Sequence, residues 1–159
     1  MRRLYITIFA SFIMLLLMPL ADSMAVSEIS PLYTHYVYMF AHGGLLHLTV
    51  NVWALLVLHN LYTWYRVSAS YLWAVAMSFF LLPSQPMLGA SVITCFFIGF
   101  IMPYMWRKSR LTVLMTVSLL LLTCVLPGMA GVQHVASFVF GLGFCYAEGL
   151  VRDFIKYVS

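Results

Sequence analysis

The sequence predicts an all-α membrane protein built from six membrane-spanning helices. Of its 159 residues, 64% are hydrophobic and only 8% are charged, whereas about a quarter of the residues in a soluble domain are charged. The apolar residues form six long runs, and Lys and Arg occur only in alternate gaps between the runs. A chain this apolar leaves almost no residues for a part outside the bilayer. We therefore expect a single membrane domain over residues 1–159.

The six apolar runs are the predicted helices. They cover residues 4–21, 45–64, 68–82, 90–106, 111–126 and 132–151. A helix needs about 20 residues to cross the hydrocarbon core, within a range of roughly 17–25. The third and fifth runs fall short of that length, so we expect local thinning of the bilayer or burial among neighbouring helices there.

The positive charges predict the orientation of the helices. If all six runs cross, every Lys and Arg falls on one side of the membrane: Arg2, Arg3, Arg66, Arg107, Lys108, Arg110, Arg152 and Lys156. The opposite connections, 22–44, 83–89 and 127–131, contain none. The positive-inside rule then places both termini in the cytoplasm. The net charge of +4 therefore indicates topology and not nucleic-acid binding.

The first run has an alternative interpretation. It follows Met1-Arg2-Arg3 and ends near Asp22-Ser23-Met24-Ala25, a pattern that resembles a secretory signal with a small-residue cleavage site. The run is long for a signal core, and the bundle needs the first helix as a wall, so we expect it to be retained. Cleavage would leave the orientation of the other helices unchanged.

The second run opens with a polar cluster formed by His42, His47 and Asn51. His47 and Asn51 are four residues apart and share a helix face. Taken singly, each side chain is more simply explained as a buried group that bonds a neighbouring helix. Polar groups inside membrane segments are costly, and three of them at one depth favour a functional site.

A serine and a third histidine open two later helices. Ser91 follows Gly89-Ala90 at the start of the fourth run, and His134 lies near the start of the sixth. By the predicted topology both lie at the outer end, where histidine could take the serine proton. Backbone N–H groups at a helix start could stabilise an oxyanion.

The predicted catalytic unit is a Ser–His dyad, because no Asp or Glu lies in the outer half of any predicted helix. We expect His35 to be solvated in the first outer loop and assign no role to His59. The three cysteines, Cys95, Cys124 and Cys145, lie in apolar runs without close spacing, so neither a disulfide framework nor a structural zinc site is expected.

Together these motifs resemble the rhomboid family of intramembrane serine proteases. The matching elements are His42-x4-His47-x3-Asn51, then Gly89-Ala90-Ser91, then His134 with Gly141 seven residues later. They occur in the expected order, on the expected helices of a six-helix bundle with both termini in the cytoplasm. The resemblance extends from about residue 33 to residue 143 of this chain.

The resemblance implies a role for each motif residue. Ser91 would be the nucleophile and His134 the general base; His47, Asn51 and the Ser91 N–H would form the oxyanion hole. His42 and Gly89 would support the site. Substrates would be single-span membrane proteins, and no metal or organic cofactor is implied. We then expect a multi-pass protein of a prokaryotic inner membrane, whose partners are transmembrane substrates and the lipid bilayer.

Departures from the family pattern keep an alternative function open. Val92 and Ser137 stand where the family usually has glycine, Cys95 replaces a common tyrosine, and the Trp-Arg pair of the first outer loop is missing. The alternative is a catalytically weak or inactive rhomboid-like protein that binds transmembrane helices. A haem held by His47 and His134 is a third hypothesis, but it would leave Ser91 and Asn51 without a role. The natural substrate and the oligomeric state stay open.

Overall fold

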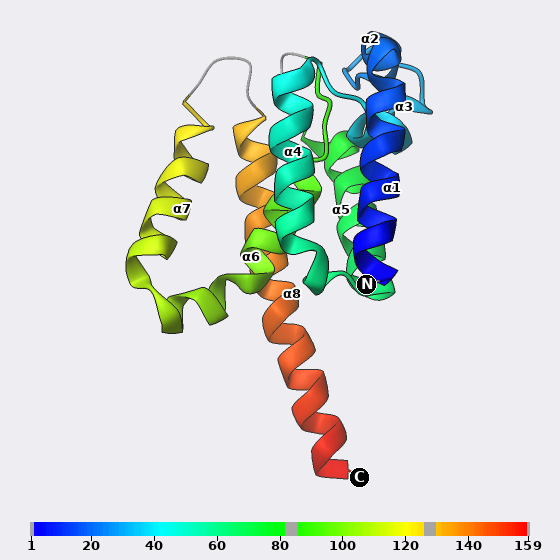
Figure 1. Cartoon of the computed structure of the whole chain (residues 1–159). Coiled ribbons are helices and arrows are strands. Elements are labelled where there is room, and N and C mark those ends of the chain that lie inside the picture. The colour runs from blue at the N-terminus through cyan, green and yellow to red at the C-terminus, as the bar shows by residue number, and fades with distance from the viewer. Residues whose placement is uncertain (1, 82–85, 126–129, 159) are drawn as a thin grey trace. The chain divides into compact units, whose positions relative to one another are not determined.

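The fold is helical throughout the part of the chain that the structure describes. A computed structural model describes residues 2–81, 86–125 and 130–158, and the only strand-like feature within them is an isolated bridge between Val26 and Met87 (Figure 1). The all-α prediction is therefore confirmed for these residues. The chain forms two compact units, Met1–Thr94 and Cys95–Ser159, and each is described on its own.

The first unit is built around three long helices (Figure 1). Its elements are α1 (Arg2–Leu17), η1 (Met18–Leu20), α2 (Ala21–Met24), α3 (Thr34–Val37), η2 (Tyr38–Phe40), α4 (Leu45–Leu58), η3 (His59–Leu61) and α5 (Trp64–Phe80). Helix α6 (Ser91–Lys108) begins here and continues into the second unit. Met14 of α1, Leu48 and Leu55 of α4 and Ala90 share one buried cluster. In this cluster Ala90, the residue before Ser91, packs against α4.

Backbone and side-chain hydrogen bonds hold the outer segments of the first unit. The backbones of Val26 and Met87 exchange bonds of 2.9 and 2.8 Å, and the N–H of Gly89 donates to the carbonyl of Tyr38 at 3.0 Å. The Tyr38 hydroxyl in turn donates to the carbonyl of Ala74 on α5 at 2.9 Å. The chain that leads into α6 is therefore tied to both the first outer segment and α5.

His35 is part of the same framework, so the prediction that it is solvated is wrong. Its Nδ1 lies 3.0 Å from Ser78 Oγ, and its ring stacks on Phe79 with centroids 4.1 Å apart. The contact could not be predicted from the sequence, because Ser78 lies 43 residues from His35 along the chain. The histidine fastens α3 to α5 and has no catalytic neighbour.

The second unit is organised by a close crossing of α6 and α8 (Gly131–Val158), with α7 (Arg110–Leu122) alongside. A methyl group added at Gly99 would overlap the carbonyl of Phe138, and one added at Gly141 would overlap the carbonyl of Phe96. Small residues let helix backbones approach in this way. Two glycines thus form a reciprocal backbone contact between α6 and α8.

We expect Gly141→Ala to destabilise the protein strongly, because the new methyl group meets backbone that cannot rotate away. Overpacking of this kind costs typically about 1–3 kcal/mol. Gly143→Ala is the matched control on the same helix, since nothing lies within 4 Å of its added methyl group. Thermal unfolding in detergent should show a lowered midpoint for Gly141→Ala only. Equal midpoints for the two variants would contradict the reciprocal contact.

The helix boundaries differ from the predicted runs at several ends; α4, for example, ends at Leu58 and not at 64. Helix α5 begins at Trp64 rather than near residue 68, because the chain is extended at Tyr62 and Thr63, and Arg66 lies in the first turn. Its guanidinium donates to the carbonyl of Leu61 at 3.1 Å. Helix α8 continues to Val158, seven residues beyond the predicted end at 151. Charged residues alone do not end a helix, which continues for as long as its backbone hydrogen bonds continue.

Two helical stretches of the described chain are long and apolar enough to cross a membrane. They are Arg3–Met24 and Gly131–Tyr157, and a third follows if Thr34–Phe40 and Leu45–Leu61, which meet at 84°, form one broken span. Each of the six predicted runs does overlap a helix of at least 13 residues: α1, α4, α5, α6, α7 and α8. The crossing of all six stays a prediction.

Candidate active site

Three of the predicted site residues meet in the first unit: His42, His47 and Gly89. The two imidazole rings lie edge to face with centroids 5.1 Å apart. A methyl group built on Gly89 would lie 2.7 Å from His47 Cε1, 2.8 Å from its Nε2 and 3.7 Å from His42 Cδ2. The backbone at Gly89 therefore packs directly on the His47 ring, with the His42 ring next to it.

Gly89 makes this contact in a conformation that suits glycine. Its φ is +103°, a left-handed value that side chains with a Cβ rarely adopt. The turn leads through Ala90 into α6, which starts at Ser91. N–H groups in the first turn of a helix point away from the helix's own carbonyls. The turn thus brings the start of α6 next to His47.

Asn51 lies one turn after His47 on α4 and is buried. Its Nδ2 donates to the His47 carbonyl at 3.0 Å, so the side chain bonds its own helix. An amide nitrogen carries two hydrogens, and this bond uses one of them. The bond orients the Asn51 side chain on the same helix face as His47.

His42 is also part of this cluster. Its side chain is only 1% exposed, and neither ring nitrogen makes a hydrogen bond of ordinary geometry within the described residues. Burial, followed by the nearby imidazole of His47, lowers the pKa of His42 to about 4, while a weaker backbone contact with Phe40 opposes the shift. His42 is therefore a neutral ring at pH 7, where it packs against Gly89 without adding charge.

His134 lies in the second unit, near the start of α8, and is buried. Its Nδ1 lies 3.4 Å from the Thr123 hydroxyl, which donates its own hydrogen to the carbonyl of Leu120 at 2.6 Å. A hydroxyl has one hydrogen, so towards His134 it can only accept. In the tautomer with its hydrogen on Nδ1, the ring donates to Thr123 and Nε2 carries the lone pair.

Thr123 is a site residue that the sequence did not predict. It lies directly after α7 within the fifth apolar run, 11 residues before His134, and one more threonine beside Thr112 and Thr116 carries no distinctive signal. Asp and Glu are the side chains that ordinarily orient a catalytic histidine, and the outer halves of the predicted helices contain neither. A hydroxyl with its hydrogen already used elsewhere can serve the same purpose.

The structure brings the predicted residues together in two groups. His42, His47, Asn51 and Gly89 lie with the start of α6 at Ser91 in the first unit, whereas His134 belongs to the second. The Ser91–His134 pairing stays a prediction. In the described part of the chain, no group of three His, Cys, Asp or Glu side chains could hold a metal ion.

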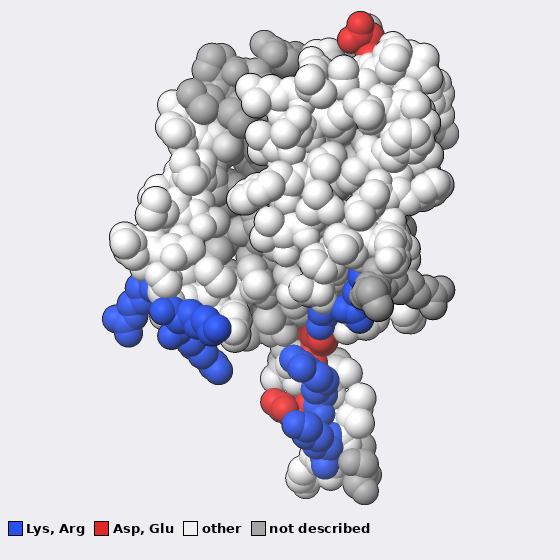
Figure 2. All heavy atoms as spheres, in the orientation of Figure 1, with Lys and Arg blue, Asp and Glu red and all other residues white. Residues whose placement is uncertain are grey.

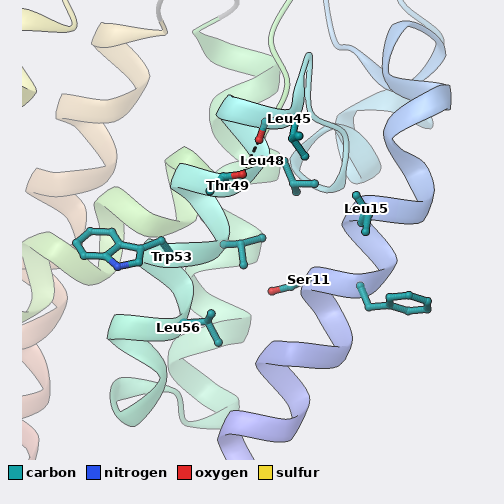
Figure 3. Close-up of a pocket in the computed structure, with 9 residues that line it drawn as sticks. Ser11, Leu15, Leu45, Leu48, Thr49, Trp53 and Leu56 are labelled. Atoms are coloured by element: carbon teal, nitrogen blue, oxygen red, sulfur yellow. Dashed lines mark hydrogen bonds between the residues drawn. The ribbon is translucent and has the colours of Figure 1, made fainter.

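A separate groove of about 440 Å³ lies between α1 and α4 (Figure 3). Its lining is almost wholly apolar: Phe12, Leu15, Leu45, Leu48, Val52, Trp53 and Leu56, with Ser11 and Thr49. Both hydroxyls donate to carbonyls of their own helices at 2.8 Å. The groove residues named here include no histidine, cysteine or carboxylate.

Comparison with known proteins assigns no family to the chain. The rhomboid resemblance therefore rests on the sequence motifs alone. No family model, curated protein or solved structure matches the chain.

Proposed function

We propose that the chain is an intramembrane serine endopeptidase that cleaves transmembrane segments of membrane proteins. The observation that carries the proposal is the contact between the His47 ring and left-handed Gly89, two residues before Ser91. It supports an oxyanion site formed by His47, Asn51 and the backbone N–H of Ser91. Polar groups inside membrane segments are costly, so their grouping supports a functional role.

The proposed mechanism uses His134 as base and then as acid. Ser91 Oγ attacks the scissile carbonyl carbon while His134 Nε2 takes the hydroxyl proton. The carbonyl oxygen becomes an oxyanion, which His47, Asn51 and the Ser91 N–H stabilise. His134 then gives the proton to the leaving amine as the C–N bond breaks. Water repeats the sequence on the acyl-enzyme and releases the carboxylate product and Ser91.

Each proposed catalytic residue lies at a similar distance along the chain from a glycine of its own helix. Ser91 precedes Gly99 on α6 by eight residues, and His134 precedes Gly141 on α8 by seven. At about 1.5 Å per residue the two distances are roughly 12 and 10 Å. Each proposed catalytic residue thus stands about two turns before the glycine at which α6 and α8 cross.

In the proposed site Thr123 positions the His134 ring. We expect Thr123→Val to lower kcat by about tenfold or more, because neutral His134 would then populate the tautomer that cannot accept the serine proton. Thr123→Ser keeps the hydroxyl and should restore the rate. The measurement is cleavage of a reporter with one transmembrane helix, followed across pH. A valine variant with the wild-type rate and pH profile would remove Thr123 from the site.

We expect Asn51→Ala to slow turnover by about 10²–10³-fold, the usual loss for one oxyanion donor. Its substrate affinity and unfolding midpoint should change little, because the lost bond is to a carbonyl that is already bonded within α4. Asn60→Ala serves as control, since that side chain is exposed on the turn after α4. A collapse of the unfolding midpoint without a specific loss of rate would show that Asn51 only packs.

We propose a multi-pass protein of a prokaryotic inner membrane, and the charge distribution within each unit supports an orientation with both termini in the cytoplasm. In the first unit, Arg3 donates to the carbonyl of Asn60 at 2.7 Å and Arg66 to that of Leu61, so both lie at the turn between α4 and α5. In the second unit, Lys and Arg gather at the α6–α7 junction and along the end of α8 (Figure 2). Each unit thus carries its cations at helix ends that the topology places inside.

The experiment that tests the proposed function is reconstitution of the purified full chain into vesicles with single-span reporter proteins. Reporters with small, helix-breaking residues near the outer end of the span should be cut there, whereas leucine-rich reporters should stay intact. Failure to cut any reporter, combined with stable co-purification of their helices, would favour the inactive helix-binding alternative.

A further inference from the structure

The junction of α6 and α7 carries three cations within four residues: Arg107, Lys108 and Arg110. All three side chains are exposed. None of them forms an ion pair with a carboxylate in the described part of the chain. Figure 2 shows this group of cations with no acidic side chain beside it on the visible face. So much uncompensated charge in so small a space calls for an anionic partner.

Aromatic side chains hold two of these cations in place. Lys108 Nζ lies 4.9 Å from the ring centroid of Tyr104, and Arg110 Cζ lies 5.8 Å from that of Trp106. Cation–π contacts of this kind fix a cation while its N–H groups stay available for an anion. Ser109 caps α7 by accepting from the N–H of Thr112, which fixes the turn between the two helices.

Exposed apolar surface adjoins the cations on both sides. Tyr104 and Trp106 are about half exposed, and on α7 the side chains of Leu111, Leu114 and Met115 are all more than half exposed. A soluble anion would match the charges but leave this surface bare. A phospholipid matches both, with its phosphate at the cations and its acyl chains along α7. Tyr and Trp are also the side chains enriched at membrane interfaces.

We propose that the α6–α7 junction is a binding site for an anionic phospholipid of the inner leaflet. The cations Arg107, Lys108 and Arg110 hold the headgroup phosphate, and Leu111, Leu114 and Met115 contact the acyl chains. Near a membrane, each Lys or Arg contributes favourably to attraction for anionic lipid. The site stands apart from the proposed peptidase residues, so it holds whether or not the chain cleaves peptides.

The test compares two double variants that remove the same charges. Lys108→Gln with Arg110→Gln removes one Lys and one Arg from the proposed site. Arg152→Gln with Lys156→Gln removes one of each from the end of α8, where Glu148 and Asp153 lie nearby in sequence. The full chain in detergent is equilibrated with equal amounts of phosphatidylglycerol and phosphatidylcholine. Native mass spectrometry then counts the lipids that stay bound.

The wild type and the α8 variant should both retain phosphatidylglycerol in preference to phosphatidylcholine. The junction variant should lose that preference by a factor on the order of ten, with unchanged helix content. Exchanging the two cations, Lys108→Arg with Arg110→Lys, should restore it. Equal preference in the two glutamine variants would overturn the site. Full competition by inorganic phosphate at the same concentration would show a site for soluble anions instead.

Discussion

Ser91→Ala and His134→Ala should each abolish cleavage of a transmembrane reporter, leaving less than about one hundredth of the wild-type rate. Without its hydroxyl, Ser91 forms no acyl-enzyme; without a base, the hydroxyl stays a poor nucleophile. Residues that act as one unit are strongly non-additive. The double variant should therefore be no slower than either single variant.

His59→Ala is the matched control for the loss of a histidine. Its Nδ1 lies 2.6 Å from the carbonyl of Leu56 on the preceding turn, and it has no role in the proposed site. That variant should cut at close to the wild-type rate. Substantial activity in Ser91→Ala would rule out the nucleophile, whereas additive losses in the double variant would separate Ser91 from His134.

Gly89→Ala should also lower turnover by about 10²-fold or more. The added methyl group would lie 2.7 Å from His47 Cε1, so the ring or the turn before Ser91 must move. A shift of about 1 Å in a catalytic geometry can cost around 10²-fold. The left-handed φ adds roughly 1–2 kcal/mol of backbone strain, so the unfolding midpoint should fall as well.

Gly44→Ala is the control for the loss of a glycine in the same unit. Nothing lies within 4 Å of its added methyl group, and its backbone is extended, so both rate and stability should stay near wild type. Trimming the ring with His47→Ala in the Gly89→Ala background should recover part of the lost stability but no activity. If Gly89→Ala behaved like Gly44→Ala, His47 would not pack on the turn as described.

The helices could be predicted from the sequence because membrane helices are set by local composition. The six apolar runs overlap α1, α4, α5, α6, α7 and α8, and the motifs around His47 and Ser91 lie at the helix starts where the runs place them. The end of α8 could not be predicted in this way. Helix α8 includes Arg152, Asp153 and Lys156. A helix outside the hydrocarbon core tolerates charge, so charged residues do not mark its end.

Contacts between segments far apart in sequence were beyond prediction. Nothing near His35 indicates Ser78 as its partner, and nothing near His134 indicates Thr123. The packing of Gly89 on His47 likewise depends on how the turn before α6 meets α4, which no local pattern determines. The motifs could therefore name the polar residues of the site, but only the fold could show how His42, His47 and Gly89 touch.

The most direct test of the account is covalent labelling by a fluorophosphonate probe. The probe reacts only with a serine that a base activates, so it reports the dyad without any need to know the substrate. We expect the purified wild type to be labelled and mass spectrometry to place the adduct on Ser91, while His134→Ala and Ser91→Ala stay unlabelled. A folded wild-type protein that takes up no label, or one labelled at another serine, would contradict the proposed active site.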